Sequence, residues 1–210
     1  MSKVLLFQGD SITDAGRNKE MLAPANKGLG IGYAHLTAAE LLASEPEKEW
    51  QIYNRGISGN RVVDLYARWK IDTLNLRPDV LSILIGVNDT WHEKANQNGV
   101  EVPRYDKIYR MLMDWTVSEL PETKIILLEP FVLLTGAVEE DWIDEINARR
   151  EVVKKIAEDY NTLFLPLQSM FDEACKKAPM EYWLGDGVHP TAAGHSLITK
   201  AWIKATESIR

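Results

Sequence analysis

Short apolar runs recur along the chain, and amphipathic stretches separate them. The run at residues 80–85, Val-Leu-Ser-Ile-Leu-Ile, is almost continuously apolar, which is typical of a strand covered on both faces. Together the runs predict strands at residues 3–8, 50–54, 80–85, 124–128 and 163–167. The amphipathic stretches predict helices at residues 33–43, 62–76, 104–120, 142–160 and 192–209.

The alternation of strands with helices predicts how the sheet is connected. A helix between successive strands favours right-handed crossovers, which place the strands parallel. We therefore expect an α/β fold, a flavodoxin-like three-layer α/β/α arrangement with a five-stranded parallel sheet. The chain has no internal repeat and no Pro/Gly/Ser-rich linker, so residues 1–210 are expected to form a single domain.

Four glycine-containing polar segments lie where a ligand site is expected. In open parallel sheets, ligands bind beyond the carboxyl ends of the strands. Three of the segments, residues 9–13, 54–61 and 86–89, follow the first three predicted strands, and the fourth, residues 186–190, precedes the last predicted helix. All four are expected to converge on one edge of the sheet as loops.

A serine, a histidine and an aspartate in these segments suit acyl transfer. Ser11 becomes an effective nucleophile only if a base takes its proton as it attacks a carbonyl. His189 can do so, because an imidazole titrates near neutral pH. Asp186 precedes it by three residues and can accept the other ring N–H, which fixes the tautomer. Capping of turns by Ser11 and Asp186 is the purely structural alternative.

An oxyanion that forms during acyl transfer needs hydrogen-bond donors directed at it. The backbone N–H groups of Ser11 and Gly59 can supply two donors, and glycine at position 59 permits a close backbone approach. The side-chain amide of Asn88 can supply a third without adding a group that titrates. The sequence thus assigns the oxyanion hole to Ser11, Gly59 and Asn88.

These segments closely resemble the four signature blocks of the SGNH/GDSL hydrolases, in the same order and with the same wide spacing. The blocks here are Gly-Asp-Ser-Ile-Thr at residues 9–13, the glycine at 59, Gly-Val-Asn-Asp at 86–89 and Asp-Gly-Val-His-Pro at 186–190. The resemblance implies the SGNH hydrolase fold and a carboxylic ester hydrolase. It assigns Ser11 as the nucleophile, Asp186 and His189 as the acid-base pair, and Ser11, Gly59 and Asn88 as oxyanion donors.

A finer resemblance is to cytoplasmic bacterial acetylesterases that act on acetylated xylan and xylo-oligosaccharides. The similar segments are residues 9–17, 29–33, 54–60 and 85–91, whereas residues 179–185 do not align. This resemblance implies an acetyl ester of a small carbohydrate as substrate. Trp91 and Trp183 lie next to catalytic blocks and are candidates for sugar stacking, although both equally suit core packing.

Two other functions remain compatible with the sequence. A lysophospholipase or thioesterase can use the same scaffold, because the fold does not determine specificity. A non-catalytic carbohydrate-binding protein is an alternative of another class, although such a protein has no need for both Ser11 and His189. Hydrolysis of a chromogenic acetate separates the catalytic from the non-catalytic class.

Charge limits the partners that the chain is expected to bind. There are 24 Lys and Arg residues against 31 Asp and Glu residues, which gives a net charge of −7. A nucleic-acid backbone or an anionic membrane would meet a surface of like charge, so we expect neither as a partner. A neutral small-molecule ester fits better. The resembled acetylesterases often assemble, so a homo-oligomer is an open alternative to a monomer.

The remaining sequence features concern location and cofactors. The sequence shows no secretory leader, no run of about 20 apolar residues that could span a membrane, and only one cysteine, Cys175. A cytoplasmic location is therefore expected. The chain has neither a P-loop nor a zinc-binding motif, and the spacing of Gly28, Gly30 and Gly32 does not match a dinucleotide-binding motif. We expect no cofactor and no metal.

Overall fold

The computed structural model describes residues 2–20 and 24–210. Within them, five strands form one sheet in the order β2-β1-β3-β4-β5, and every pairing is parallel. The strands are β1 Val4–Gly9, β2 Gln51–Asn54, β3 Val80–Leu84, β4 Lys124–Leu128 and β5 Leu163–Leu165. The predicted strands and the predicted α/β class are confirmed.

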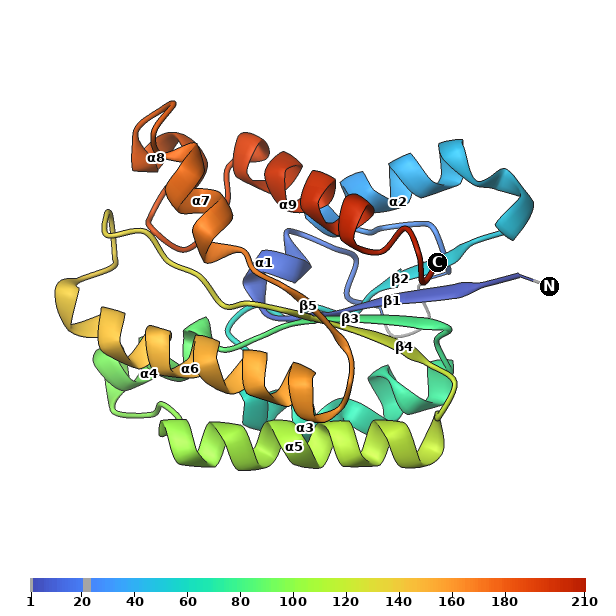
Figure 1. Ribbon diagram of the computed structural model, residues 1–210, viewed down its shortest axis with the longest axis horizontal. Helices are drawn as coiled ribbons and strands as arrows, with labels where there is room; N and C mark the ends of the chain where they lie inside the picture. The colour runs from blue at the N-terminus through green and yellow to red at the C-terminus, as the bar shows by residue number, and fades with distance from the viewer. Residues whose placement is uncertain (1, 21–23) are drawn as a thin grey trace.

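Helices cover both faces of this sheet, which makes the three layers seen in Figure 1. One layer contains α2 Tyr33–Ser44, α7 Gln168–Ala174, α8 Met180–Trp183 and α9 Ala192–Ala205. The other contains α3 Val62–Asp72, α4 Val87–Asn96, α5 Val102–Glu119 and α6 Glu140–Asp159. The short elements are α1 Ser11–Asp14 and the 3-10 helices η1 Pro46–Lys48 and η2 Leu74–Leu76.

The apolar core has two parts, one on each face of the sheet. Leu5 and Phe7 of β1 belong to the cluster beneath α2 and α9, whereas Leu6 belongs to the cluster beneath α3 and α5. All three side chains are fully buried, as the alternation of side chains along a strand requires for a central strand. Each cluster contains a fully buried tryptophan, Trp202 in the first and Trp69 in the second.

The chain after β3 was predicted incorrectly. We expected residues 86–89 to form a loop, but helix α4 begins at Val87 and includes Asn88 in its first turn. The buried face of this turn includes Asn88, Asp89 and Thr90. Because these buried side chains are polar, the segment lacks the apolar periodicity by which helices are recognised. The short helices α7 and α8 were also not predicted.

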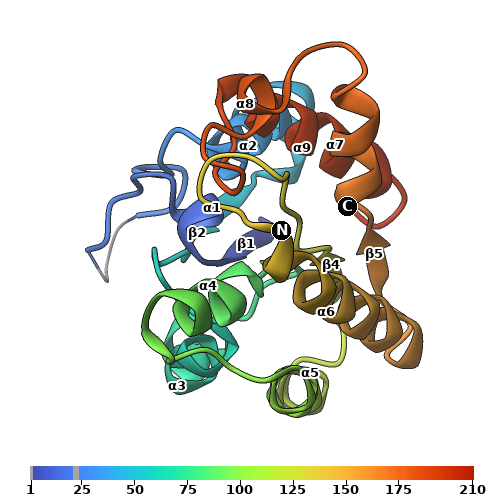
Figure 2. The same ribbon diagram turned by 90° about the vertical axis from the view of Figure 1, so that its left-hand side faces the viewer.

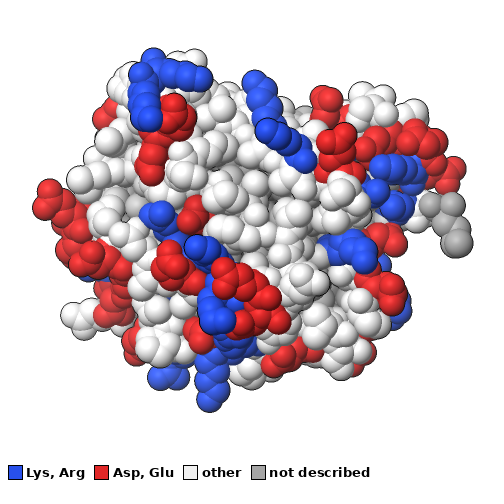
Figure 3. Space-filling model, viewed as in Figure 1, with Lys and Arg blue, Asp and Glu red and all other residues white. Residues whose placement is uncertain are grey.

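Charged side chains of both signs are interspersed on the molecular face shown in Figure 3. Ion pairs join several charged side chains of the protein, for example Arg110 with Asp159 at 2.9 Å and Lys155 with Asp159 at 2.6 Å. In the part of the chain that the structure describes, no helix is long and apolar enough to cross a membrane.

Candidate active site

The candidate site lies at the carboxyl ends of the strands, the edge that faces the viewer in Figure 2. Ser11 is the first residue of α1, directly after β1. Asp10 caps this helix by accepting a hydrogen bond from the Ile12 N–H at 3.0 Å. As a first-turn residue, Ser11 has a backbone N–H without a partner inside its own helix.

The Ser11 hydroxyl is joined to His189 and Asp186 by two short hydrogen bonds. Ser11 Oγ lies 2.7 Å from His189 Nε2, and His189 Nδ1 lies 2.7 Å from Asp186 Oδ2. With a proton on Nδ1, the ring donates to Asp186 and leaves Nε2 to accept from the serine hydroxyl. The structure therefore brings together three residues that the sequence separates by up to 178 positions.

Hydrogen bonds within the loop between α8 and α9 fix its conformation. Asp186 Oδ1 accepts from the backbone N–H of His189 at 2.7 Å and from that of Val188 at 3.0 Å. Gly187 adopts a φ of +86°, and a Cβ at this position would collide with Thr135 O. Only glycine therefore fits between the two candidate side chains, and one hydrogen-bonded turn presents both.

The Asp186 carboxylate is favoured in its ionised form. Partial burial alone would raise its pKa, but hydrogen bonds from the His189 backbone and ring and from the Val188 backbone hold the pKa below its usual range. About two fifths of the His189 and Asp186 side chains are exposed, 42% and 41%. The pair is thus open to water on one side.

Gly59 and Asn88 lie next to each other at this edge. Asn88 Nδ2 donates to the carbonyl oxygen of Asn60 at 3.1 Å, so the amide is directed towards the turn after β2. The second N–H of that amide remains for another acceptor. Gly59 has a φ of +83°, and a Cβ there would approach only His92 Nε2, at 3.9 Å. The glycine is therefore required for its backbone conformation and not for lack of space.

A buried carboxylate fixes the other side of the Gly59 turn. Asp14 Oδ2 accepts from the Ser58 backbone N–H at 3.0 Å and from the Ser58 hydroxyl at 2.7 Å. Lys19 Nζ forms an ion pair with the same Asp14 oxygen at 2.9 Å. This role of Asp14 could not be predicted from the sequence, because the spacing of an aspartate from a serine 44 residues away carries no local signal.

The two tryptophans singled out from the sequence differ in their surroundings. The Trp91 ring lies 5.8 Å from the His189 ring and 5.4 Å from the Trp142 ring, centroid to centroid. Trp183 contacts Tyr182 edge-on at 4.9 Å, and its indole N–H donates to Ala178 O at 3.3 Å. Trp91 therefore borders the candidate base, whereas Trp183 contacts its own segment and packs, partly buried, against the core beneath α2 and α9.

Two further carboxyl groups are buried beside the site. Burial raises the pKa of Asp10 to about 7, against the opposing effects of the Ile12 N–H and the His189 charge. Burial likewise raises the pKa of Asp89 to about 7, opposed by Arg149 and by the Val62 N–H. Within the described residues, Asp10 Oδ2 has no hydrogen-bond partner. Asp10 and Asp89 directly neighbour Ser11 and Asn88 in the chain.

His195 does not compete with His189 for the role of base. Burial lowers the pKa of His195 to about 4, and the charge of His189 acts in the same direction. Its Nδ1 accepts a hydrogen bond from the Tyr33 N–H at 3.1 Å. The ring of His195 is thus a neutral packing and hydrogen-bonding group that joins α9 to α2.

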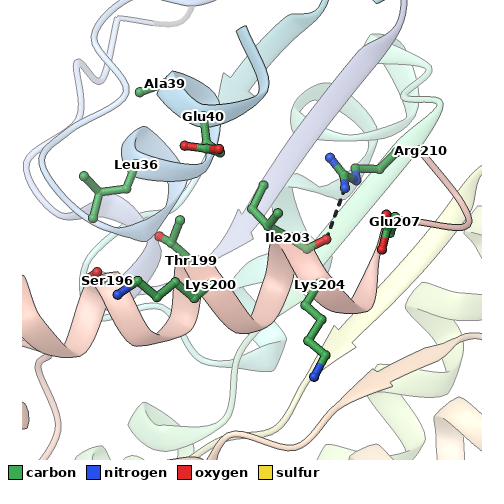
Figure 4. Close-up of a pocket in the computed structure, with 10 residues that line it drawn as sticks. All are labelled: Leu36, Ala39, Glu40, Ser196, Thr199, Lys200, Ile203, Lys204, Glu207 and Arg210. Carbon is green, nitrogen blue, oxygen red and sulfur yellow. Dashed lines mark hydrogen bonds between the residues drawn. The ribbon is translucent and has the colours of Figure 1, made fainter. Parts of the chain in front are cut away.

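A separate cavity of about 790 Å³ lies between α2 and α9. Figure 4 shows its lining, with Arg210 directed back at the carbonyl of Ile203, a contact of 3.2 Å. None of the candidate catalytic residues lines it. Among residues 2–20 and 24–210, no group of three or more His, Cys, Asp or Glu side chains is arranged to hold a metal ion.

Comparisons with known proteins identify relatives of this chain. The GDSL-like lipase/acylhydrolase family matches residues 7–197. An acetylxylan esterase of Geobacillus stearothermophilus is 36% identical over 205 residues, which cover 95% of this chain and 92% of that protein. Its crystal structure superimposes with a TM-score of 0.87 over 97% of this chain and 93% of the other.

A GDSL-like lipase of Parabacteroides merdae is similar along the full length. Its crystal structure has a TM-score of 0.95 and 45% identity, and the match covers 100% of this chain and 97% of that one. The family match spans most of the chain, and the Geobacillus esterase exceeds 30% identity over nearly all of it. The chain therefore belongs to the GDSL-like lipase/acylhydrolase family and is a carboxylic ester hydrolase.

Proposed function

We propose that the chain is a serine esterase that removes acetyl groups from small carbohydrates through an acyl-enzyme. The observation that carries the proposal is the hydrogen-bonded series from Ser11 Oγ to His189 Nε2 and from His189 Nδ1 to Asp186 Oδ2, each step 2.7 Å long. Two structures of the similar Geobacillus esterase are of catalytic mutants, one with a histidine and one with a serine replaced by alanine.

The reaction begins when Ser11 Oγ attacks the ester carbonyl and His189 Nε2 takes the hydroxyl proton. Asp186 stabilises the resulting imidazolium through the Nδ1–H bond. The alcohol then leaves with the proton from His189, and an acetyl group stays on Ser11. His189 next deprotonates a water molecule, which attacks the acetyl-enzyme, releases acetate and restores the serine.

Three donors converge on the oxyanion in this proposal. The Ser11 backbone N–H lies at the start of α1, the Gly59 N–H lies in the turn after β2, and Asn88 offers its second amide N–H. Such donors act chiefly in the transition state, because the negative charge on the oxygen is absent from the ground-state ester.

The substrate assignment rests on similarity and on Trp91. The similar Geobacillus protein is named an acetylxylan esterase and an acetyl-xylooligosaccharide esterase. Trp91 borders His189, which protonates the leaving alcohol in this scheme, and an indole ring can stack on a sugar. A substrate contact by Trp183, a cytoplasmic location and assembly into a homo-oligomer remain predictions.

The mechanism is tested first at the nucleophile. We expect Ser11→Ala to keep the fold but lose about 10³-fold or more in kcat on 4-nitrophenyl acetate, because triad members act as a unit. A serine-directed phosphonate should label the wild type at Ser11 and leave the variant unlabelled. Ser44→Ala, at an exposed position on α2, is the matched control. Full activity in Ser11→Ala would refute the proposed mechanism.

The substrate class is tested with a panel of esters. Acetylated xylo-oligosaccharides should exceed butyryl and octanoyl esters and lysophospholipids in kcat/KM. Trp91→Ala should weaken turnover of the sugar esters more than that of 4-nitrophenyl acetate, because stacking acts only on the sugar. A preference for octanoyl esters or lysophospholipids would favour the lipase-type alternative and leave the Ser11 mechanism intact.

A further inference from the structure

The guanidinium of Arg68, on α3, contacts the ends of two neighbouring strands. Its Nε donates to Asn60 Oδ1 at 2.8 Å, and its Nη2 donates to Gly9 O at 3.2 Å. Its Nη1 lies 2.9 Å from Arg55 O and 3.0 Å from Gln8 Oε1. Only 13% of the Arg68 side chain is exposed. One buried side chain thus ties the end of β1 to the turn that follows β2.

These contacts flank both proposed backbone donors of the oxyanion hole. Gly9 lies two residues before Ser11, and Asn60 directly follows Gly59. The strand register of β1 with β2 ends at Phe7 and Asn54. Beyond it, the Ile57 N–H donates to Gly9 O at 3.1 Å, and Ser58 donates to Asp14. Arg68 adds a side-chain bridge from α3 to both loops.

The third proposed donor, the side-chain amide of Asn88, depends on Asn60 as well. The backbone carbonyl of Asn60 accepts from Asn88 Nδ2, and its side chain accepts from Arg68 Nε. A shift of Asn60 therefore also moves the partner that orients the Asn88 amide. Arg68 can therefore affect the Gly59 and Asn88 donors through Asn60, and the Ser11 donor through Gly9.

We propose that Arg68 is a positioning residue that sets the spacing of the three oxyanion donors, an inference that rests on the proposed function. Arginine suits this role because its planar fork carries diverging N–H groups that reach several acceptors at once. A lysine keeps the charge but offers all its donors from one nitrogen. Arg68 acts through Gly9 and Asn60.

Small displacements of such donors are costly to the reaction. A misplacement of about 1 Å can reduce turnover by about 10²-fold. We therefore expect Arg68→Lys to lower kcat by about 10²-fold while KM stays within about twofold, since the loss falls on the transition state. In Arg68→Ala, added methylguanidine should restore activity at least in part, because it can reoccupy the space and the hydrogen bonds.

A control variant at Asp72 distinguishes a positioning role of Arg68 from a stabilising role. The Asp72 carboxylate pairs with Arg68 Nη1 at 2.9 Å on the same helix, and the Asp72 backbone carbonyl, which the substitution keeps, accepts from Gln8 Nε2 at 3.0 Å. Asp72→Asn removes the ion pair but leaves the contacts of Arg68 with Gly9 and Asn60. We expect this variant to show a lower Tm and a wild-type kcat. An Arg68→Lys variant with a lower Tm and a wild-type kcat would overturn the proposal.

A second readout measures the oxyanion hole directly. A boronic acid forms a tetrahedral adduct with a catalytic serine, and its affinity should fall in Arg68→Lys in parallel with kcat. An unchanged affinity would overturn the proposal. If Arg68 variants do not fold, Asn60→Ala removes a single acceptor and should lower kcat by about tenfold; an unchanged kcat there would also overturn it. Activity that survives Ser11→Ala refutes the proposed function itself.

Discussion

Of two variants at Asp186, we expect Asp186→Ala to be the more active and Asp186→Asn to be the more stable. In Asp186→Asn, the remaining oxygen can still accept from the His189 and Val188 backbone N–H groups, so the loop keeps its shape. An amide NH₂ then faces His189 Nδ1, where a carboxylate oxygen stood. Because two donors cannot pair, the ring changes tautomer and places its proton on Nε2, opposite the Ser11 hydroxyl.

The expected losses in kcat follow from this geometry and from the solvent exposure of the Asp186 side chain. The wrong tautomer cannot take the serine proton, and such a change costs about 10⁴-fold in kcat, or about 5.4 kcal/mol. In Asp186→Ala, water can reach the site, because 41% of the Asp186 side chain is exposed, and can accept from Nδ1–H. The lost charge-assisted hydrogen bond then costs about 1.5–3 kcal/mol, or roughly 10- to 150-fold. Asp186→Ala should therefore be the more active variant.

Stability should follow the reverse order. Asp186→Ala leaves the two backbone N–H groups of the loop without their acceptor, which should lower its Tm below that of Asp186→Asn. Hydrogen bonds hold the pKa of Asp186 below its usual range, so its contribution is present above pH 4 or so and is lost only as the pH falls through the lowered pKa.

The assay is kcat/KM on 4-nitrophenyl acetate from pH 5 to pH 9, with Tm measured on the same samples. Asp186 remains ionised throughout that range in the wild type, so its own titration adds no pH dependence to the wild-type activity there. His35→Ala, at an exposed position on α2, is a neutral control. An Asp186→Asn variant as active as Asp186→Ala would refute the role of the carboxylate in selecting the tautomer.

Two further predictions follow from buried groups. Asn88→Ala should lower kcat by about 10²–10³-fold with little change in KM, because the lost donor acts on charge that only the transition state carries; a rise in KM alone would contradict this role. Relative to the wild type, Asp10→Asn should gain about 2–3 kcal/mol of stability as the pH rises from 5 to 8. The pKa of Asp10 is raised to about 7 in the folded protein, whereas the same carboxyl ionises at lower pH in the unfolded chain, so rising pH favours unfolding of the wild type alone. Chemical denaturation at both pH values measures the gain, and a pH-independent difference would show that Asp10 does not titrate in this range.

The sheet could be predicted because its strands carry their own signal. Runs such as Val80–Leu84 are apolar at every position but Ser82, and burial on both faces requires this. The strand-end location of Ser11, Gly59 and Asn88 followed from the parallel arrangement alone. These elements depend on local composition, which the sequence displays directly.

The missed features depend on contacts between distant segments. Helix α4 buries polar side chains in its first turn, next to the Gly59 region. The sequence of this turn therefore has no apolar pattern that predicts a helix. Trp142 reaches Trp91 from the start of α6, and Arg68 reaches two strand ends from the middle of α3. A tryptophan or an arginine on an amphipathic helix ordinarily indicates packing or solvent exposure. Only the folded arrangement shows that these side chains border the candidate site.

The separation of Ser11 from His189 by 178 residues has a consequence for synthesis and folding. The serine, which directly follows β1, emerges from the ribosome 178 residues before its base. A nascent chain therefore carries an inert hydroxyl until the loop before α9 has docked. Contacts this distant in sequence close slowly, so regained ester hydrolysis after denaturation reports the final docking step and not the formation of the sheet.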